Sequence, residues 1–171
     1  MTTIDAPPLR EDVAIWPALA SLTSCLCQEI VASGLPEVYI CTPLPGEQIA
    51  AEYVSEDAGM AWTRLVSAFP STTFPAQALV GCFAPLAFEV ELGVLYCAPE
   101  PGADGSPPDM AAQFDATRLQ VAAMAAMRRA LLCCFPTGNS KDLILGPYAP
   151  IGPDGGVVGG TWTVWVAEGA I

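Results

Sequence analysis

The spacing of hydrophobic and polar positions changes along this chain, and the changes predict its secondary structure. Apolar residues recur at intervals of three and four from 16 to 33, which predicts a first helix that Gly34 and Pro36 end. Apolar and polar residues alternate over 86–98, which predicts a strand. A segment rich in alanine and methionine predicts a second helix over 107–134, with most of its circumference apolar.

Shorter apolar runs, separated by turn-forming residues, complete the pattern. Further strands are predicted over 37–41, 59–70, 143–149 and 161–167. The order is therefore helix, three strands, helix, and one or two strands. Because the connections are short, the sheet should be mainly antiparallel, with both helices on one face. We predict a single α+β domain over 11–171, preceded by an extended arm over 1–10.

The strand over 86–98 places two carboxylates on one face. Phe88 and Val90 face one way, whereas Glu89 and Glu91 face the other, about 7 Å apart by strand geometry. Such a pair could serve acid–base catalysis or supply half of a divalent-metal site. No further acid is obviously brought in, so an ordinary solvated sheet face is the favoured interpretation. In a ring, the same face could form an acidic lining.

Composition and charge narrow the class of protein. Of 171 residues, 53% are hydrophobic and the formal net charge is −12, which excludes a disordered chain and a sequence-independent grip on nucleic acid. The apolar excess favours extensive contacts with other copies. The longest uncharged apolar run, 78–88, is too short to span a bilayer, and the N-terminus does not resemble a secretion signal, so we expect no membrane partner.

The side chains that commonly carry out catalysis are scarce. The chain has no histidine, so Ser-His and Cys-His pairs are excluded, and no pair of cysteines has zinc-ligand spacing. The seven cysteines are expected to be free thiols in a reducing compartment. The glycines of 152–160 match no phosphate-binding motif and precede a strand, so a turn or bulge is expected there. We predict no catalytic residues, cofactor or metal.

The last predicted strand has apolar groups on both sides. Trp162 and Val164 face one way and Trp165 the other, which core packing explains for one tryptophan only. The second tryptophan is expected either under the first helix or against a partner. A partner strand could add to the Trp162–Val166 edge, which would suit a monomeric adaptor.

Four segments, in this order of elements, resemble a known family. They are AWTRLVSAFPSTTFP (61–75), LAFEVELGVLYCAP (86–99), the helix ending MRRALLCC, and LGPYAPIGPDGGVVGGTWTV (145–164). They are similar to head-to-tail joining proteins of long-tailed actinobacterial bacteriophages, and the helix–three strands–helix–strand plan most resembles the tail terminator. The stopper and adaptor of the same neck remain alternatives. A small enzyme that uses a cysteine or the two glutamates is the alternative from another class.

The resemblance implies a structural virion protein, assembled in the host cytoplasm. Such a protein forms a ring, usually of six copies, that caps the tail tube, ends its polymerisation and docks the head connector. Genomic DNA passes through the ring without specific binding, and the acidic charge suits this passage. Subunits of the family join through the sheet and its flanking loops, which makes the 42–58 loop and five side chains the interface candidates: Glu89, Glu91, Trp162, Val164 and Trp165.

Overall fold

A computed structural model describes residues 13–46, 54–55, 58–78, 84–133, 142–153 and 156–168. The predicted N-terminal arm lies outside these residues. The described elements are α1 (Ile15–Ala32), β1 (Val38–Pro43), β2 (Gly59–Pro70), β3 (Leu86–Cys97), α2 (Met110–Cys133), β4 (Leu143–Ile151) and β5 (Val157–Ala167). The strands form one sheet in the order β1-β2-β3-β5-β4, in which β1 is parallel to β2 and the other neighbours are antiparallel. The predicted α+β class and element order are confirmed.

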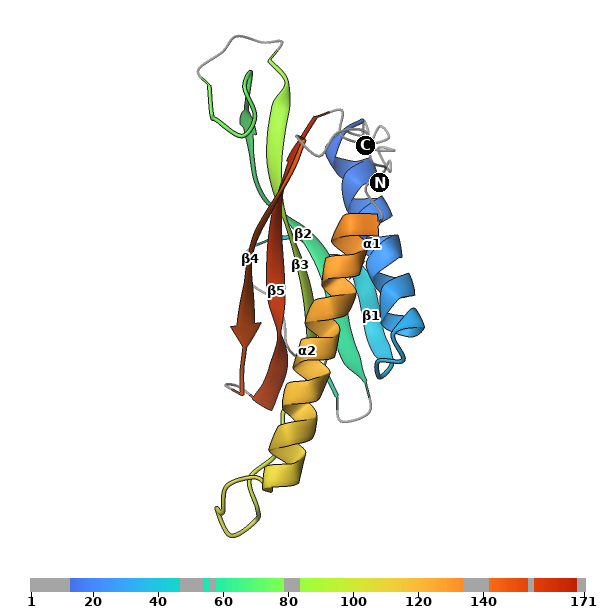
Figure 1. Cartoon of the computed structure of the whole chain (residues 1–171), viewed down its shortest axis with the longest axis vertical. Coiled ribbons are helices and arrows are strands. Elements are labelled where there is room, and N and C mark those ends of the chain that lie inside the picture. Colours follow the sequence, from blue (N-terminus) through green and yellow to red (C-terminus); the bar gives the residue numbers. More distant parts are fainter. Residues whose placement is uncertain are drawn as a thin grey trace, which may run out of the picture.

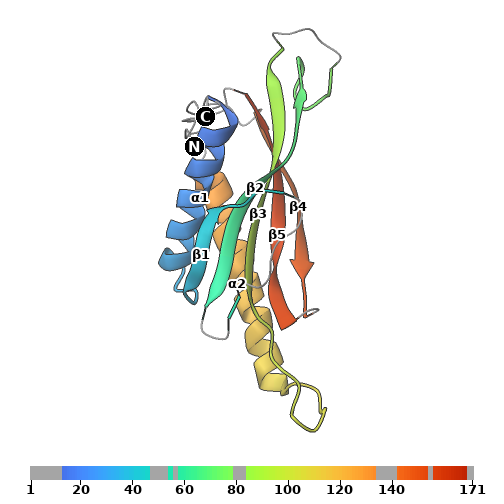
Figure 2. The same ribbon diagram turned by 180° about the vertical axis from the view of Figure 1, so that it is seen from behind.

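Both helices cover the same face of the sheet. Figure 1 shows α2 crossing in front of β3 and β5, with α1 beside it over β1 and β2. Seen from behind, the sheet lies in front of α1 and α2, so neither of these helices covers this face (Figure 2). The molecule therefore has a helical side and an open sheet side.

The apolar stripe of α1 packs on the sheet as its spacing predicts. Leu22, Leu26 and Ile30 are fully buried in the main core. The helix ends where Gly34 adopts φ of 64°, and the Leu35 amide donates to the Ile30 carbonyl. By length and mean hydropathy α1 could cross a membrane, but its buried stripe here belongs to the protein core.

The main core lies between the helices and alternate residues of the central strands. Phe88, Val90 and Leu92 of β3 are buried there, as the alternation predicts. Inside it, the hydroxyl groups of Thr23 on α1 and Thr63 on β2 hydrogen-bond to each other. This polar contact fixes where α1 crosses β2, because a buried hydroxyl must keep its hydrogen-bond partner.

Full burial in α2 is confined to its second half, whereas Ala116 and Leu119 of the first half pack against the core partly buried. Its buried residues all lie between Ala123 and Leu131, and in the half before them no residue is fully buried. Arg129 Nε donates to Glu29 Oε2 at 2.8 Å, which ties α2 to α1. The helix begins at Met110, after the two prolines that were expected inside it. Its N-terminal end extends past the end of the sheet (Figure 1).

A second, smaller core covers one end of the open sheet side. Met60, Trp62, Leu95 and Val157 are buried there, and Leu44 and Val54 pack against them from the connection between β1 and β2. The Trp62 ring fills the space above Gly93 on β3: a Cβ at Gly93 would lie 1.9 Å from Trp62 Cζ2. Gly93 is therefore required by the close approach of this ring.

A disulfide joins α1 to the neighbouring edge strand. Cys27 is bonded to Cys41 of β1, and their Cα atoms are 6.0 Å apart. Cys25 is disulfide-bonded as well, whereas Cys133 is an exposed free thiol. The expectation of free thiols is thus wrong for three cysteines. Sequence spacing could not show it, because the pair meets only when β1 packs beside the second half of α1.

Gly93→Ala tests the packing of Trp62. We expect the added methyl group to lower the free energy of unfolding by about 2 kcal/mol, because the indole has no room to move away from it. Urea denaturation followed by tryptophan fluorescence measures the loss. In a Trp62→Leu background the same change should cost much less. An equal cost in both backgrounds would contradict the contact.

The Cys27–Cys41 bond can be tested by removing it. The double variant Cys27→Ala, Cys41→Ala should lose about 3 kcal/mol of stability, the value for a loop of about 15 residues. Thermal unfolding of the oxidised proteins gives the difference, and Cys133→Ala serves as the control that should unfold like wild type. Peptide mapping without reductant should recover Cys27 linked to Cys41; wild-type protein, purified in air, with both thiols open to alkylation would refute the bond.

Candidate interaction surfaces

One row of side chains crosses the open sheet side beyond the second core. Ser67 of β2 pairs with Glu89 of β3, Glu89 with Trp165 of β5, and Trp165 with Ile144 of β4. The Ser67 hydroxyl donates to Glu89 Oε2 at 3.2 Å. The Trp165 ring packs over Gly146 of β4, where a Cβ would lie 3.0 Å from Cζ3. We call these four residues, Ser67, Glu89, Ile144 and Trp165, the sheet patch.

The neighbouring row holds a buried ion pair. Glu91 Oε1 lies 2.8 Å from Arg64 Nε, and Arg64 Nη2 donates to Glu91 Oε2 at 3.1 Å. The indole Nε1 of Trp62 donates to Glu91 Oε1 at 3.3 Å. The expected solvated face is therefore wrong for Glu91, which is buried. Sequence alternation correctly gave the face, but not that Arg64 and Trp62 would cover it.

This pairing bears on the acid–base and metal alternatives. Both oxygens of the Glu91 side chain accept hydrogen bonds from a cation or an indole, so this group is held as a structural acceptor. Glu89 is bound by Ser67 and stays partly exposed. Among the residues that the structure describes, no group of three cysteine or acidic side chains could hold a metal ion. The two glutamates thus have different roles, one inside the fold and one at its surface.

The terminal strand is central in the sheet, not at its edge. β5 is paired with β3 on one side and β4 on the other, so strand addition along Trp162–Val166 is not available and that expectation is wrong. Val164 is fully buried in the main core. Trp162 packs against the same core and donates from Nε1 to the Gly146 carbonyl at 2.7 Å. Of the tryptophans in this strand, Trp165 is the one on the open side.

Two glycines predicted to precede this strand lie within it and allow neighbouring strands to pack closely. β5 begins at Val157, four residues earlier than predicted, so Gly159 and Gly160 lie inside it. A Cβ at Gly159 would lie 2.0 Å from the Val94 carbonyl oxygen, and one at Gly160 would lie 2.3 Å from Tyr148 Oη. Burial raises the pKa of Tyr148, whose hydroxyl donates to the Gly159 carbonyl. The glycine-rich composition predicted a turn or bulge, but Gly159 and Gly160 belong to the strand, where neighbouring atoms leave no room for a side chain.

The exposed face of α2 carries large apolar side chains. Met110 is 86% exposed, Phe114 65% and Val121 53%. They recur at intervals of four and seven residues, which places them on one side of the helix together with Arg128 and Leu132. Arg118 lies at the border of this side and forms an exposed pair with Asp115 at 3.7 Å. We call the six residues Met110, Phe114, Arg118, Val121, Arg128 and Leu132 the helix patch.

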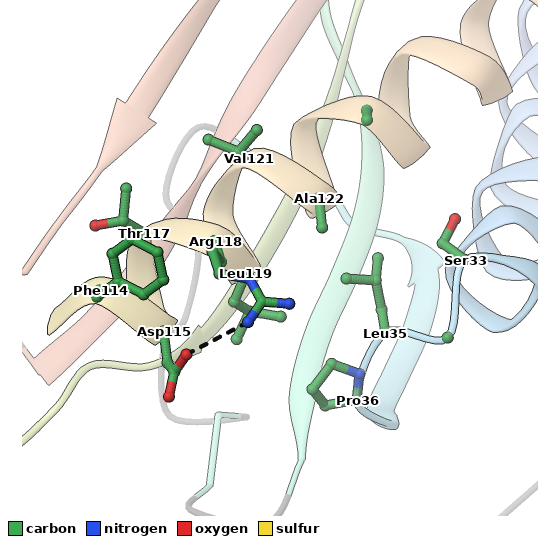
Figure 3. A pocket seen from close by; sticks show the side chains of 12 residues that line it. Ser33, Leu35, Pro36, Phe114, Asp115, Thr117, Arg118, Leu119, Val121 and Ala122 are labelled. Carbon is green, nitrogen blue, oxygen red and sulfur yellow. Dashed lines mark ion pairs between the residues drawn. The ribbon is translucent and has the colours of Figure 1, made fainter. Parts of the chain in front are cut away.

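A groove of about 680 Å³ runs beside the first half of the helix patch. Figure 3 shows Phe114, Arg118 and Leu119 of α2 on one side. Leu35 and Pro36 from the α1–β1 connection lie on the other side. The groove lies between α2 and the α1–β1 connection, and sequence periodicity could not show that these two segments face each other.

Exposed acids gather at the end of the molecule where α2 begins. Glu37 precedes β1, and Glu100, Asp104 and Asp109 lie in the connection from β3 to α2. Hydrogen bonds from Ser106 lower the pKa of Asp104, which keeps that carboxylate charged. Nearby, burial raises the pKa of Tyr96 to about 12, so its hydroxyl remains a donor to the Pro36 carbonyl. This end of the molecule therefore presents negative charge, and the Tyr96–Pro36 hydrogen bond joins β3 to the α1–β1 connection there.

Comparisons with known proteins assign no role to these surfaces. No protein-family model matches the chain, and no curated protein matches it either. A function must therefore be supported by the sheet patch, the helix patch, the charge distribution and the order of elements.

The Arg64–Glu91 pair predicts an asymmetric cost of substitution. Glu91→Gln should lower the free energy of unfolding by about 2 kcal/mol, because the largely buried guanidinium of Arg64 loses its carboxylate. Urea denaturation measures the cost. Glu89→Gln on the same face is the matched control and should cost less than about 1 kcal/mol. Equal costs at the two positions would show that Glu91 is not held in a buried pair.

Proposed function

We propose that this chain is a structural subunit of a bacteriophage neck, a ring-forming protein of the tail terminator type. Its ring would cap the last ring of the tail tube, end tube polymerisation and dock the head connector. The order of elements supports this: helix, three strands, helix and two strands, with both helices on one face. It is the plan that the sequence resemblance implies.

The observation that carries the proposal is the pair of uncovered faces on one subunit. The helix patch is apolar, and the sheet patch on the other side exposes part of Trp165 and Ile144. Exposed apolar patches on a folded chain usually mark contact surfaces. A ring subunit needs two such surfaces, because each copy contacts a neighbour on either side.

The charge of the chain supports a channel for DNA. The formal net charge is −12, and exposed acids gather at the end where α2 begins. Negative surface charge repels the phosphate backbone, so DNA can move past it without being retained. The same charge keeps the free subunit soluble before assembly.

The disulfides fit a particle that leaves the cell. Cys27 and Cys41 would stay reduced during assembly in the host cytoplasm, because cytosolic thiols are kept reduced. Disulfides persist on virion surfaces, which are exposed to an oxidising medium. The Cys27–Cys41 bond is therefore consistent with a virion protein that assembles in the cytoplasm with reduced thiols and forms the disulfide afterwards.

The adaptor and stopper rings of the same neck share these features. What separates them is the partner: a terminator binds the end of the tail tube, whereas an adaptor or stopper binds the head connector. The enzyme alternative gains no support from Glu91, whose carboxylate is occupied by Arg64 and Trp62.

Assembly of tail tubes in the presence of the protein tests the proposal. Light scattering and electron microscopy should show rings close to six times the subunit mass. Added to polymerising tail-tube protein from the same genome, these rings should shorten the tubes and sit at one end. Rings that bind only the connector would assign the adaptor or stopper role. A strict monomer that leaves tube length unchanged would reject the proposal.

A further inference from the structure

We propose that the helix patch of one subunit docks on the sheet patch of a second copy of this chain. The inference rests on the proposed ring function and names the contact that would build the ring. In the described residues the helix patch is exposed and the sheet patch is partly exposed, and α2 and the open sheet side lie on opposite sides of the subunit (Figures 1 and 2).

Charge complementarity identifies the occupant. Although the chain has a net charge of −12, α2 carries three arginines and one acid, Asp115. Among the described residues, every exposed cation lies on this helix, since Arg64 is buried against Glu91. Arg129 is tied to Glu29 of α1, which leaves Arg128 and, in an exposed pair with Asp115, Arg118 beside the apolar stripe. A partner for this surface should be acidic and partly apolar.

The sheet patch of another copy has these properties. Glu89 stands in the middle of the row, flanked by Trp165, and Ile144 is 37% exposed on the outer strand. It supplies a carboxylate for an arginine and an aromatic surface for Phe114 and Val121. Because Ser67 already orients the Glu89 side chain, a contact with it costs less side-chain entropy.

The groove extends the contact surface of the helix patch. Leu35 and Pro36 face Leu119 across it, so an apolar side chain of the neighbour can enter beside Arg118 (Figure 3). Phe114 stands at its rim. Aromatic and arginine side chains next to apolar pockets are the usual centres of binding energy at protein interfaces.

A contact between two different patches has a definite consequence for assembly. When one copy docks its helix patch on a second copy, the second still presents a free helix patch and the first a free sheet patch. Such a head-to-tail contact repeats from copy to copy and closes into a ring when the rotation permits. A symmetric dimer would instead bring the same patch of two copies together.

Two variants that each disable one patch provide the test. Phe114→Asp removes the helix patch and Trp165→Asp the sheet patch, and each should weaken self-association by about thirtyfold or more. Each variant alone should therefore run as a monomer in size-exclusion chromatography with light scattering. Mixed in equal amounts, they should form heterodimers and nothing larger, because each pair retains one intact contact. Native mass spectrometry identifies the mixed dimer.

Controls separate loss of contact from loss of fold. Circular dichroism should be unchanged in both variants, and Ile144→Asp replaces Trp165→Asp if the latter unfolds. Tyr39→Asp adds the same charge to a side chain that is 77% exposed on edge strand β1, outside both patches, and should assemble like wild type. Arg128→Glu should weaken assembly less than Phe114→Asp and reduce its sensitivity to salt.

The outcomes distinguish this inference from the proposed function. If wild type forms rings and both patch variants still form them, the helix-to-sheet contact is wrong while the ring function stands. Monomeric variants that stay monomeric when mixed also overturn it. If wild type is a strict monomer, both proposals fail. If wild type binds a DNA duplex and Arg118→Glu with Arg128→Glu removes that binding, the helix patch is a nucleic-acid surface and the inference is rejected.

Discussion

A sheet with two faces, of which the two helices in the described part of the chain cover one, is the constraint that shapes this molecule. Both helices pack on one face, where the leucine stripe of α1 and the buried half of α2 form the main core. Within the described residues, the other face is covered at one end, where Trp62 lies over Gly93 and the β1–β2 connection packs against it. Further along that face, the Arg64–Glu91 pair stabilises the charged row within the sheet.

The same constraint gives the subunit two different sides. The N-terminal end of α2 extends past the sheet, and along its length the helix turns an apolar, arginine-bearing side outward. The opposite side presents Trp165 and Glu89. In the proposed ring each of these surfaces would be buried by the next copy, so the uncovered apolar area of the single chain would become interface. The exposed acids at the end where α2 begins belong to neither patch, although Asp109 adjoins Met110 of the helix patch, and in the proposed ring they would line the channel.

Local patterns in the sequence predicted most of the fold. The alternation around Phe88 gave β3, the leucine spacing gave α1, and Gly34 gave its end, because each signal depends only on near neighbours in the chain. Non-local contacts could not be predicted in this way. Arg64 is 27 residues from Glu91, and Cys27 meets Cys41 only after β1 packs beside α1. The composition around Gly159 predicted a turn or bulge, but this glycine lies in β5, close to Val94 of the neighbouring strand.

The interface candidates likewise include features that local sequence patterns predicted and features that they did not. Alternation correctly put Glu89 and Trp165 on one face, but it could not show that β5 would lie between two other strands, which places Val164 in the core. The sequence predicted that α2 is apolar on most sides, which is consistent with its exposed apolar stripe. It could not predict which part of the helix would extend past the sheet, because that depends on the length of the strands beneath it.

Electron cryomicroscopy of the purified assembly would show directly which surfaces of neighbouring subunits meet. We expect a closed ring in which the α2 helix of each subunit lies against β5 and β4 of the next, with Phe114 near Trp165 across every interface. A reconstruction in which the subunits meet by matching faces around a two-fold axis would contradict it, as would a ring whose helix patches all face solvent.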